Sequence, residues 1–171
     1  VHSVNSANLS FGDDVVVIGC GIMGAFHIQL AKLRGARVAV CEIDSVRLEI
    51  AKRMGADVLI DSSGCDPVEK VKEFTGGRGA DAVFCTSALV DLAGQAINMA
   101  GKLGRVILYS SFHPKKPIDL DVNKVHYEEN IITGSVNPRT VDFLQASRLL
   151  SNGAIDVSEL ISGVYPLEQA E

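Results

Sequence analysis

The chain has 171 residues, of which 47% are hydrophobic and 22% charged, and its formal net charge at pH 7 is -5. This size and composition are typical of one globular domain with a buried core, and the acidic balance argues against nucleic acid as the main partner. We expect no membrane segment, because no apolar run approaches the roughly 20 residues that span a bilayer. The polar N-terminus does not resemble a signal peptide. The scattered cysteines favour reduced thiols in a cytoplasmic protein, without a metal site: Cys20, Cys41, Cys65 and Cys85.

The first predicted elements surround a glycine motif. Residues 1–9 are expected to end a helix, and the β-branched run 15–18 predicts a strand buried on both faces. Gly19, Gly21 and Gly24 follow with G-x-G-x-x-G spacing. The first glycine permits a tight turn, the second lets a pyrophosphate approach the backbone, and the third lets the next helix pack closely. That helix offers free N–H groups and its positive dipole end to phosphates, so the motif predicts a dinucleotide site.

The next predicted strand ends in a carboxylate. The helix after the glycine motif is predicted to cover 22–34. The strand that follows it ends at Glu42, about 20 residues past the glycines, where a ribose-binding acid is expected. Such an acid accepts hydrogen bonds from both ribose hydroxyls and repels a 2′-phosphate, which predicts NAD rather than NADP. The alternative is a solvated acid at a strand end. Arg47 either flanks the adenosine or lies on an exposed helix face, and both interpretations are open.

The rest of the chain alternates between strands and helices. The predicted elements are a helix capped by Ser45 and closed by Gly55, strand 56–60, a helix starting at Asp66-Pro67, connection 75–79, strand 81–85, helix 89–100, strand 102–109, strand 130–135 and helix 140–150. This alternation predicts an α/β Rossmann fold with a doubly wound, six-stranded parallel sheet in the order 3-2-1-4-5-6. The strands then end on one rim, where ligands bind.

Several of these motifs together resemble the cofactor domain of medium-chain zinc-dependent alcohol dehydrogenases, with most similarity to the sorbitol and threonine dehydrogenase branch. The segments that carry the resemblance are 15–24, 31–36, 42–44, 47–52, 55–57, 104–106, 129–135 and 164–167. The resemblance covers nearly the whole chain. It implies NAD(H)-dependent oxidation of a secondary alcohol or polyol to a ketone.

The resemblance also implies which residues contact NAD. Ile22 and Met23 would lie under the pyrophosphate, Glu42 would hold the ribose, and Arg47 would sit beside the adenosine. Further implied contacts follow the fourth, fifth and sixth strands: Thr86, Ser87, Tyr109, Ser110, Ser111, Val136 and Asn137. Residues 109–111, after the fifth strand, would line the nicotinamide. Val136 and Asn137, after the sixth strand, would hold its carboxamide through their backbone. The pair after the fourth strand stands where the family commonly has a glycine.

By the same resemblance, residues 1–12 are the end of an inter-domain helix and a turn, and 13–153 form the NAD-binding domain. Residues 154–171 would lead back to a separate catalytic domain, which holds the zinc ligands in this family. None of those ligands occurs here, so we expect no catalytic or metal-binding residue in the chain, and no turnover by the chain alone. The zinc would belong to a longer parent enzyme, a homo-oligomer. We expect the four histidines to be uninvolved in catalysis: His2, His27, His113 and His126.

Two other classes share parts of this pattern. A free-standing NAD(H)-sensing or regulatory module needs the same glycines and acid, but no catalytic domain. A methyltransferase also pairs a glycine turn with an acid at a strand end, although the third glycine, Gly24, argues against that class.

Overall fold

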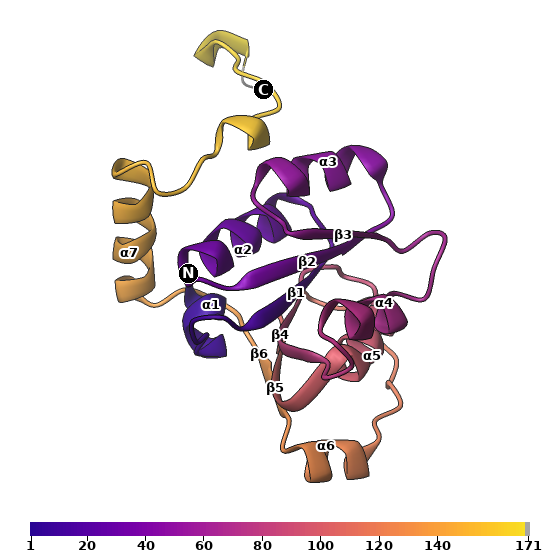
Figure 1. Cartoon of the computed structure of the whole chain (residues 1–171). Helices are drawn as coiled ribbons and strands as arrows, with labels where there is room; N and C mark the ends of the chain where they lie inside the picture. Colours follow the sequence, from indigo (N-terminus) through magenta and orange to yellow (C-terminus); the bar gives the residue numbers. More distant parts are fainter. Residues whose placement is uncertain (170–171) are drawn as a thin grey trace.

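The computed structural model describes residues 1–169, and positions 170 and 171 of the predicted segment 154–171 lie outside the described residues. A parallel six-stranded sheet forms the centre, in the order β3-β2-β1-β4-β5-β6 (Figure 1). Its strands are β1 (Asp14–Ile18), β2 (Arg37–Glu42), β3 (Val58–Asp61), β4 (Ala80–Cys85), β5 (Ala100–Leu108) and β6 (Ile131–Gly134). The predicted Rossmann fold and strand order are confirmed.

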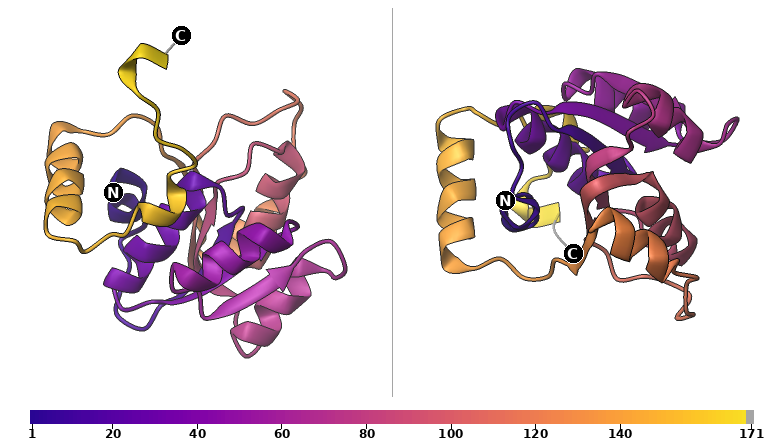
Figure 2. Two further views of the ribbon diagram at one scale, coloured as in Figure 1. Left: turned by 90° about the horizontal axis from the view of Figure 1, so that it is seen from above. Right: turned by 60° about the horizontal axis from the view of Figure 1, so that its bottom comes forward.

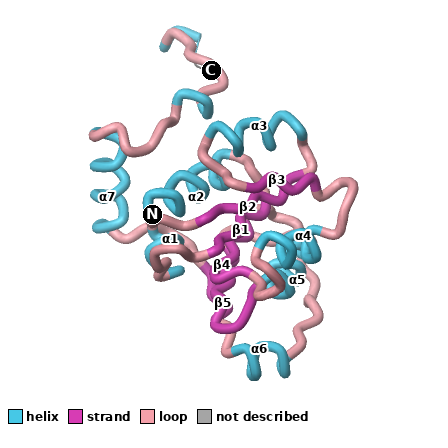
Figure 3. The backbone as a smooth tube through the Cα atoms, viewed as in Figure 1, coloured by secondary structure: helices cyan, strands magenta, loops and turns pink. Residues whose placement is uncertain are grey.

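Helices cover both faces of the sheet. The helices are α1 (His2–Ala7), α2 (Ile22–Leu33), α3 (Ser45–Arg53), α4 (Pro67–Phe74), α5 (Val90–Met99), α6 (Val122–Glu128) and α7 (Thr140–Ser151), followed by short 3-10 turns at Ser158–Leu160 and Leu167–Gln169. Side chains of α1, α2, α3 and α7 pack on one face, and those of α4 and α5 pack on the other. Figure 3 shows this arrangement of helices around the strands.

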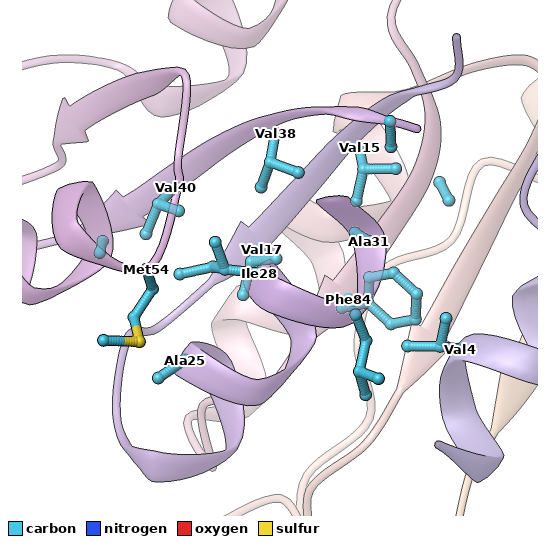
Figure 4. Packing of buried hydrophobic residues seen from close by; sticks show 14 of the residues in the cluster. Val4, Val15, Val17, Ala25, Ile28, Ala31, Val38, Val40, Met54 and Phe84 are labelled. Carbon is cyan, nitrogen blue, oxygen red and sulfur yellow. The ribbon is translucent and has the colours of Figure 1, made fainter. Parts of the chain in front are cut away.

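Strand β1 is the centre of the core because its two faces are both covered. Val15 and Val17 pack against the α2 side, where Ile28 and Phe84 fill the space between helix and sheet (Figure 4). Val16 and Ile18 pack against the opposite layer. Burying each such side chain contributes about 1.5–3 kcal/mol. An uninterrupted apolar run is therefore stable here, whereas an alternating pattern would bury polar groups.

The boundaries of α3 and β3 differ from the sequence prediction. The N-cap of α3 is Asp44 and not Ser45: the Asp44 carboxylate accepts hydrogen bonds from the backbone N–H groups of Val46 and Arg47, at 2.8 and 3.2 Å. Strand β3 begins at Val58 rather than residue 56. The reason is that the Ala56 N–H still closes α3 by donating to the Ala51 carbonyl, at 3.0 Å.

Helix α6 is absent from the sequence prediction. Its first turn is capped by the Asp121 carboxylate, which accepts from the N–H groups of Asn123 and Lys124. The Lys124 ammonium donates to the Ala100 carbonyl at 2.9 Å and so ties α6 to β5. No residue of α6 is fully buried, which explains why it lacks the apolar periodicity that indicates a helix.

Helix α7 lies beside α1, on the side of α1 that faces away from the sheet (Figure 2). The buried Asp142 carboxylate joins the two helices by accepting from His2 Nδ1 at 3.0 Å and Asn5 Nδ2 at 3.1 Å. It also binds the Arg139 guanidinium, which holds the pKa of the Asp142 carboxyl well below its usual range. His2 is therefore a structural partner of α7. Among residues 1–169 no helix has the length and apolarity needed to cross a bilayer.

Candidate functional site

The loop between β1 and α2 contains three glycines, and the fold requires glycine at only two of these positions. Gly19 adopts φ +88°, which favours glycine, and a Cβ on Gly24 would lie 2.0 Å from the Gly19 carbonyl oxygen. The fold therefore requires both. Gly21 has φ -73°, and a Cβ there meets no atom within 4 Å. The fold does not require glycine at this position. Because glycine has no side chain, the backbone of Gly21 is open to the space beside it.

The Glu42 carboxylate is joined to this loop by hydrogen bonds. Its Oε2 atom accepts from the Cys20 N–H at 2.8 Å, and its Oε1 atom accepts from the N–H groups of Ile43 and Asp44 at 2.8 and 3.2 Å. Only 7% of Glu42 is exposed. The interpretation as a solvated acid at a strand end is therefore wrong. Backbone groups hold this carboxylate next to the glycine loop at the ends of β1 and β2.

Arg47 lies at the outer end of the same region. Its guanidinium is 3.9 Å from Glu42 Oε2 and about half exposed. The structure thus combines features of both sequence interpretations: Arg47 lines a groove and also faces solvent.

A groove of about 920 Å³ extends over the carboxyl ends of β1, β2 and β4. It brings together much of the site expected from sequence: Gly19, Gly21, Ile22, Met23, Gly24, Glu42, Arg47, Thr86 and Ser87. The first N–H groups of a helix have no intrahelical partner, and α2 begins in this groove. The groove therefore combines a helix N-terminus with a carboxylate a short distance along the same rim.

Thr86 has a structural contact that the sequence did not indicate. Its Oγ1 atom lies 3.0 Å from the carbonyl oxygens of both Ile18 and Gly19, to which it donates. The Ser110 hydroxyl in turn donates to the Thr86 carbonyl at 2.7 Å. These bonds connect the glycine turn to the ends of β4 and β5, so Thr86 and Ser110 stabilise the turn that forms part of the groove.

A second pocket, of about 380 Å³, adjoins the groove through Met23, which lines both. It contains the other expected residues Tyr109, Val136 and Asn137. Ser110 and Ser111 line neither space. Residues from α1 and α7 close the pocket on its far side.

Two further polar residues of this pocket, His27 and Ser135, were not expected at the site from sequence. His27 is almost fully buried, and its ring nitrogens lie 2.7 Å from the Met23 carbonyl and 2.7 Å from the Ser3 hydroxyl. Burial lowers the pKa of His27 to about 4, so the imidazole is neutral at pH 7. The hydroxyl of Ser135 is also buried and has no hydrogen-bond partner within the described part of the chain. In the sequence, the only indication that His27 belongs to the site is that it lies one helical turn after Met23.

Zinc ligation does not fit the described residues. Between positions 1 and 169, no three His, Cys, Asp or Glu side chains gather in a way that would hold a metal ion. Burial raises the pKa of Cys20 and Cys85 to about 11 and that of Cys41 to about 12. These thiols are therefore protonated at pH 7 in the metal-free chain.

The fold and the groove at its rim define a Rossmann-type domain with a nucleotide-binding shape. A family model described as zinc-binding dehydrogenase matches residues 23–152. The chain belongs to this family, and the resemblance inferred from sequence is confirmed.

Two relatives with dehydrogenase names agree with this family. The chain is 33% identical over 172 residues to D-arabitol-phosphate dehydrogenase of Enterococcus avium, a match that covers 99% of the chain and 49% of that protein. It is 33% identical over 174 residues to L-threonine 3-dehydrogenase of Bacillus subtilis strain 168, covering 100% and 49%. The chain thus spans about half the length of the curated relatives it matches.

Solved structures agree on the fold. An alcohol dehydrogenase zinc-binding domain protein from Burkholderia ambifaria superposes with a TM-score of 0.88 and 27% identity, over 98% of this chain and 46% of that one. The 2R,3R-butanediol dehydrogenase of Bacillus subtilis gives a TM-score of 0.84 and 26% identity, over 94% and 46%.

Proposed function

We propose that this chain is the NAD(H)-binding part of a zinc-type dehydrogenase that oxidises a secondary alcohol or polyol to a ketone. The family and the dehydrogenase names of its relatives support this proposal. Residues 13–153 would form the binding domain, and 1–12 and 154–171 would connect it to a catalytic domain.

The contrast between Gly21 and Gly24 is the observation that carries the proposal. Close packing of α2 against the turn explains Gly24, whereas a Cβ at Gly21 would meet no atom within 4 Å, and this open backbone supports the approach of a pyrophosphate. The N–H groups at the start of α2, on Ile22 and Met23, would bind the pyrophosphate, and Glu42 would accept from the ribose hydroxyls. Bound NAD supplies the hydride acceptor; this chain binds and orients it.

The nicotinamide end of the cofactor would lie toward the second pocket. Met23 lines both spaces, so a dinucleotide that crosses Met23 reaches Tyr109, Val136 and Asn137. Thr86, Ser87, Ser110 and Ser111 stay in the proposal as flanking contacts. The hydrogen bonds of Thr86 and Ser110 support a role in shaping the turn.

Glu42 favours NAD over NADP in this proposal. A buried carboxylate fixed by backbone N–H groups would repel a 2′-phosphate. A structural neighbour from Sinorhizobium meliloti 1021 is bound to NADP, but at 24% identity this match concerns the fold alone.

Fluorescence titration with NADH and NADPH tests the preference. We expect wild type to bind NADH more tightly, and Glu42→Gln to weaken NADH binding about tenfold, because it removes a charge-assisted hydrogen bond. The same variant should leave NADPH binding unchanged or improve it. Equal binding of both coenzymes by wild type, or an unaltered preference in the variant, would show that Glu42 does not select the coenzyme.

Turnover is assigned to the whole enzyme and not to this chain. The described residues offer no group of three or more His, Cys, Asp or Glu side chains that could hold zinc. We expect no alcohol oxidation by the chain when zinc and NAD are added, in an assay that follows NADH absorbance. Sustained NADH production would contradict this. The relatives named above are all dehydrogenases, so they give no support to the sensor or the methyltransferase interpretation.

A homo-oligomeric state and a cytoplasmic location are also predictions. Light scattering on the purified chain tests the first, and fractionation of the source cells tests the second.

A further inference from the structure

His27 lies at the centre of a buried cluster that connects α1, α2 and the end of β5. The ring Nδ1 atom is 2.7 Å from the Met23 carbonyl, and Nε2 is 2.7 Å from the Ser3 hydroxyl. A carbonyl only accepts, so Nδ1 carries the proton and Nε2 accepts from the serine. Both ring nitrogens are thereby satisfied by a single neutral tautomer.

The same ring also contacts two aromatic side chains. Its centroid is 4.8 Å from the Phe84 ring and 4.9 Å from the Tyr109 ring, which it meets edge-on. The Tyr109 hydroxyl lies 3.2 Å from the Met23 sulfur. His27 thus contacts Met23 at its carbonyl and Tyr109 at its ring, and these two side chains touch each other.

A buried histidine with two hydrogen bonds is often no more than a satisfied core residue. Gln29 on the same helix is such a case, because its amide exchanges two 2.8 Å bonds with the backbone of Asp156, and it lines neither the groove nor the second pocket. His27 differs because its partner Met23 lines both the groove and the second pocket, and its partner Tyr109 lines the second pocket.

We infer that His27 is a positioning residue that holds Met23 and Tyr109 against the nicotinamide half of the bound dinucleotide. The inference rests on the proposed function. It adds His27, which lies at the second pocket and away from the part of the groove proposed for the adenosine half. Burial keeps the imidazole neutral by lowering the pKa of His27 to about 4. The orientation of α1 is coupled to the cofactor site through Ser3.

Comparison of NADH with ADP-ribose, which lacks the nicotinamide, tests the inference on the 171-residue chain. His27→Phe keeps an aromatic ring but removes both hydrogen bonds. We expect it to weaken NADH binding about five- to tenfold and to leave ADP-ribose binding unchanged. Gln29→Leu is the matched control: it should lower the melting temperature without changing the ratio of the two affinities.

A second variant keeps the test decisive if His27→Phe does not fold. Ser3→Ala removes the hydroxyl that donates to Nε2 and should change the same ratio about twofold to threefold. The inference is overturned if both ligands weaken together, if Gln29→Leu shifts the ratio equally, or if wild type binds NADH and ADP-ribose with equal affinity. Failure of wild type to bind either ligand would instead contradict the proposed function.

Discussion

At the scale of single residues, glycines with the same spacing motif serve different purposes. Gly24 lies against the Gly19 carbonyl, where any side chain collides with backbone, and Gly21 faces open space. The sequence motif treats them alike. The structure shows that packing requires glycine at position 24 but not at position 21, where we propose that a pyrophosphate approaches.

Gly21→Asn should leave stability unchanged or slightly higher, because position 21 is the N-cap of α2 and asparagine is a favourable cap. Its side chain occupies the phosphate side of the groove, so NADH affinity should fall at least tenfold, or about 1.4 kcal/mol. Thermal melting and NADH titration check the two halves of the prediction. Undiminished NADH binding would show that no phosphate approaches Gly21.

Gly24→Ala should show the opposite order of effects. Its methyl group would lie 2.0 Å from a backbone oxygen, and overpacking of this kind costs about 1–3 kcal/mol or more. We expect a clear loss of stability in urea unfolding, with weaker NADH binding as a consequence. An alanine tolerated at full stability would contradict the close packing of α2 on β1.

The buried imidazole of His27 predicts a pH dependence of stability. Its pKa is about 4 in the folded chain and about 6.5 in an unfolded one, so the unfolded state binds more protons between these values. Stability is therefore complete above about pH 6.5 and is lost as the pH falls toward 4. Between pH 7.5 and 5.0, wild type should lose about 2 kcal/mol more than His27→Phe. Urea unfolding at both pH values measures this, and parallel losses would show that His27 titrates normally.

At the scale of elements, the strongest sequence patterns were the most reliable. The strand at 15–18, the turn and helix start at the glycine motif, and the Asp66-Pro67 helix start were confirmed, because each pattern states one local requirement unambiguously. The prediction missed helix α6, because a polar surface helix lacks apolar periodicity. It also placed the start of β3 too early, because the end of α3 extends into residues that look like a strand. The cap of α3 was misplaced by one residue, because Asp44 and Ser45 are both good caps.

The cap of α3 gives a direct test. Asp44→Ala should lower the free energy of unfolding by about 1 kcal/mol, because it removes the acceptor for two N–H groups. Ser45→Ala, the cap expected from sequence, should change it by less than about 0.5 kcal/mol. Chemical denaturation of both variants distinguishes them, and a larger effect at Ser45 would reverse the assignment.

At the scale of the whole molecule, part of the site was predictable and part was not. The residues gathered in the groove follow directly from the glycine motif and the strand ends, which any parallel sheet places on one rim. The contact of Ser3 with His27 was not predictable. It depends on how α1 packs across α2, and no spacing in the sequence encodes that packing.

The attachment of α7 to α1 is a further whole-molecule feature. Asp142→Ala would leave His2, Asn5 and Arg139 without their shared acceptor. We expect amide hydrogen exchange to accelerate in α7 while the sheet keeps its protection. Gln145→Ala, which removes only an exposed bond to Asn5, is the control. Unchanged exchange in α7 would show that apolar packing alone holds the helix.

The strand order also has a consequence for synthesis of the protein. Strand β1 stands between β2 and β4, and its partners in β4 begin at Ala82, after the whole of β2 and β3 has been translated. A chain that ends before β4 therefore leaves the backbone N–H and C=O groups on that edge of β1 unpaired. The groove over the ends of β1, β2 and β4 cannot form before β4 is translated, so a ligand bound there could stabilise the fold only after that point.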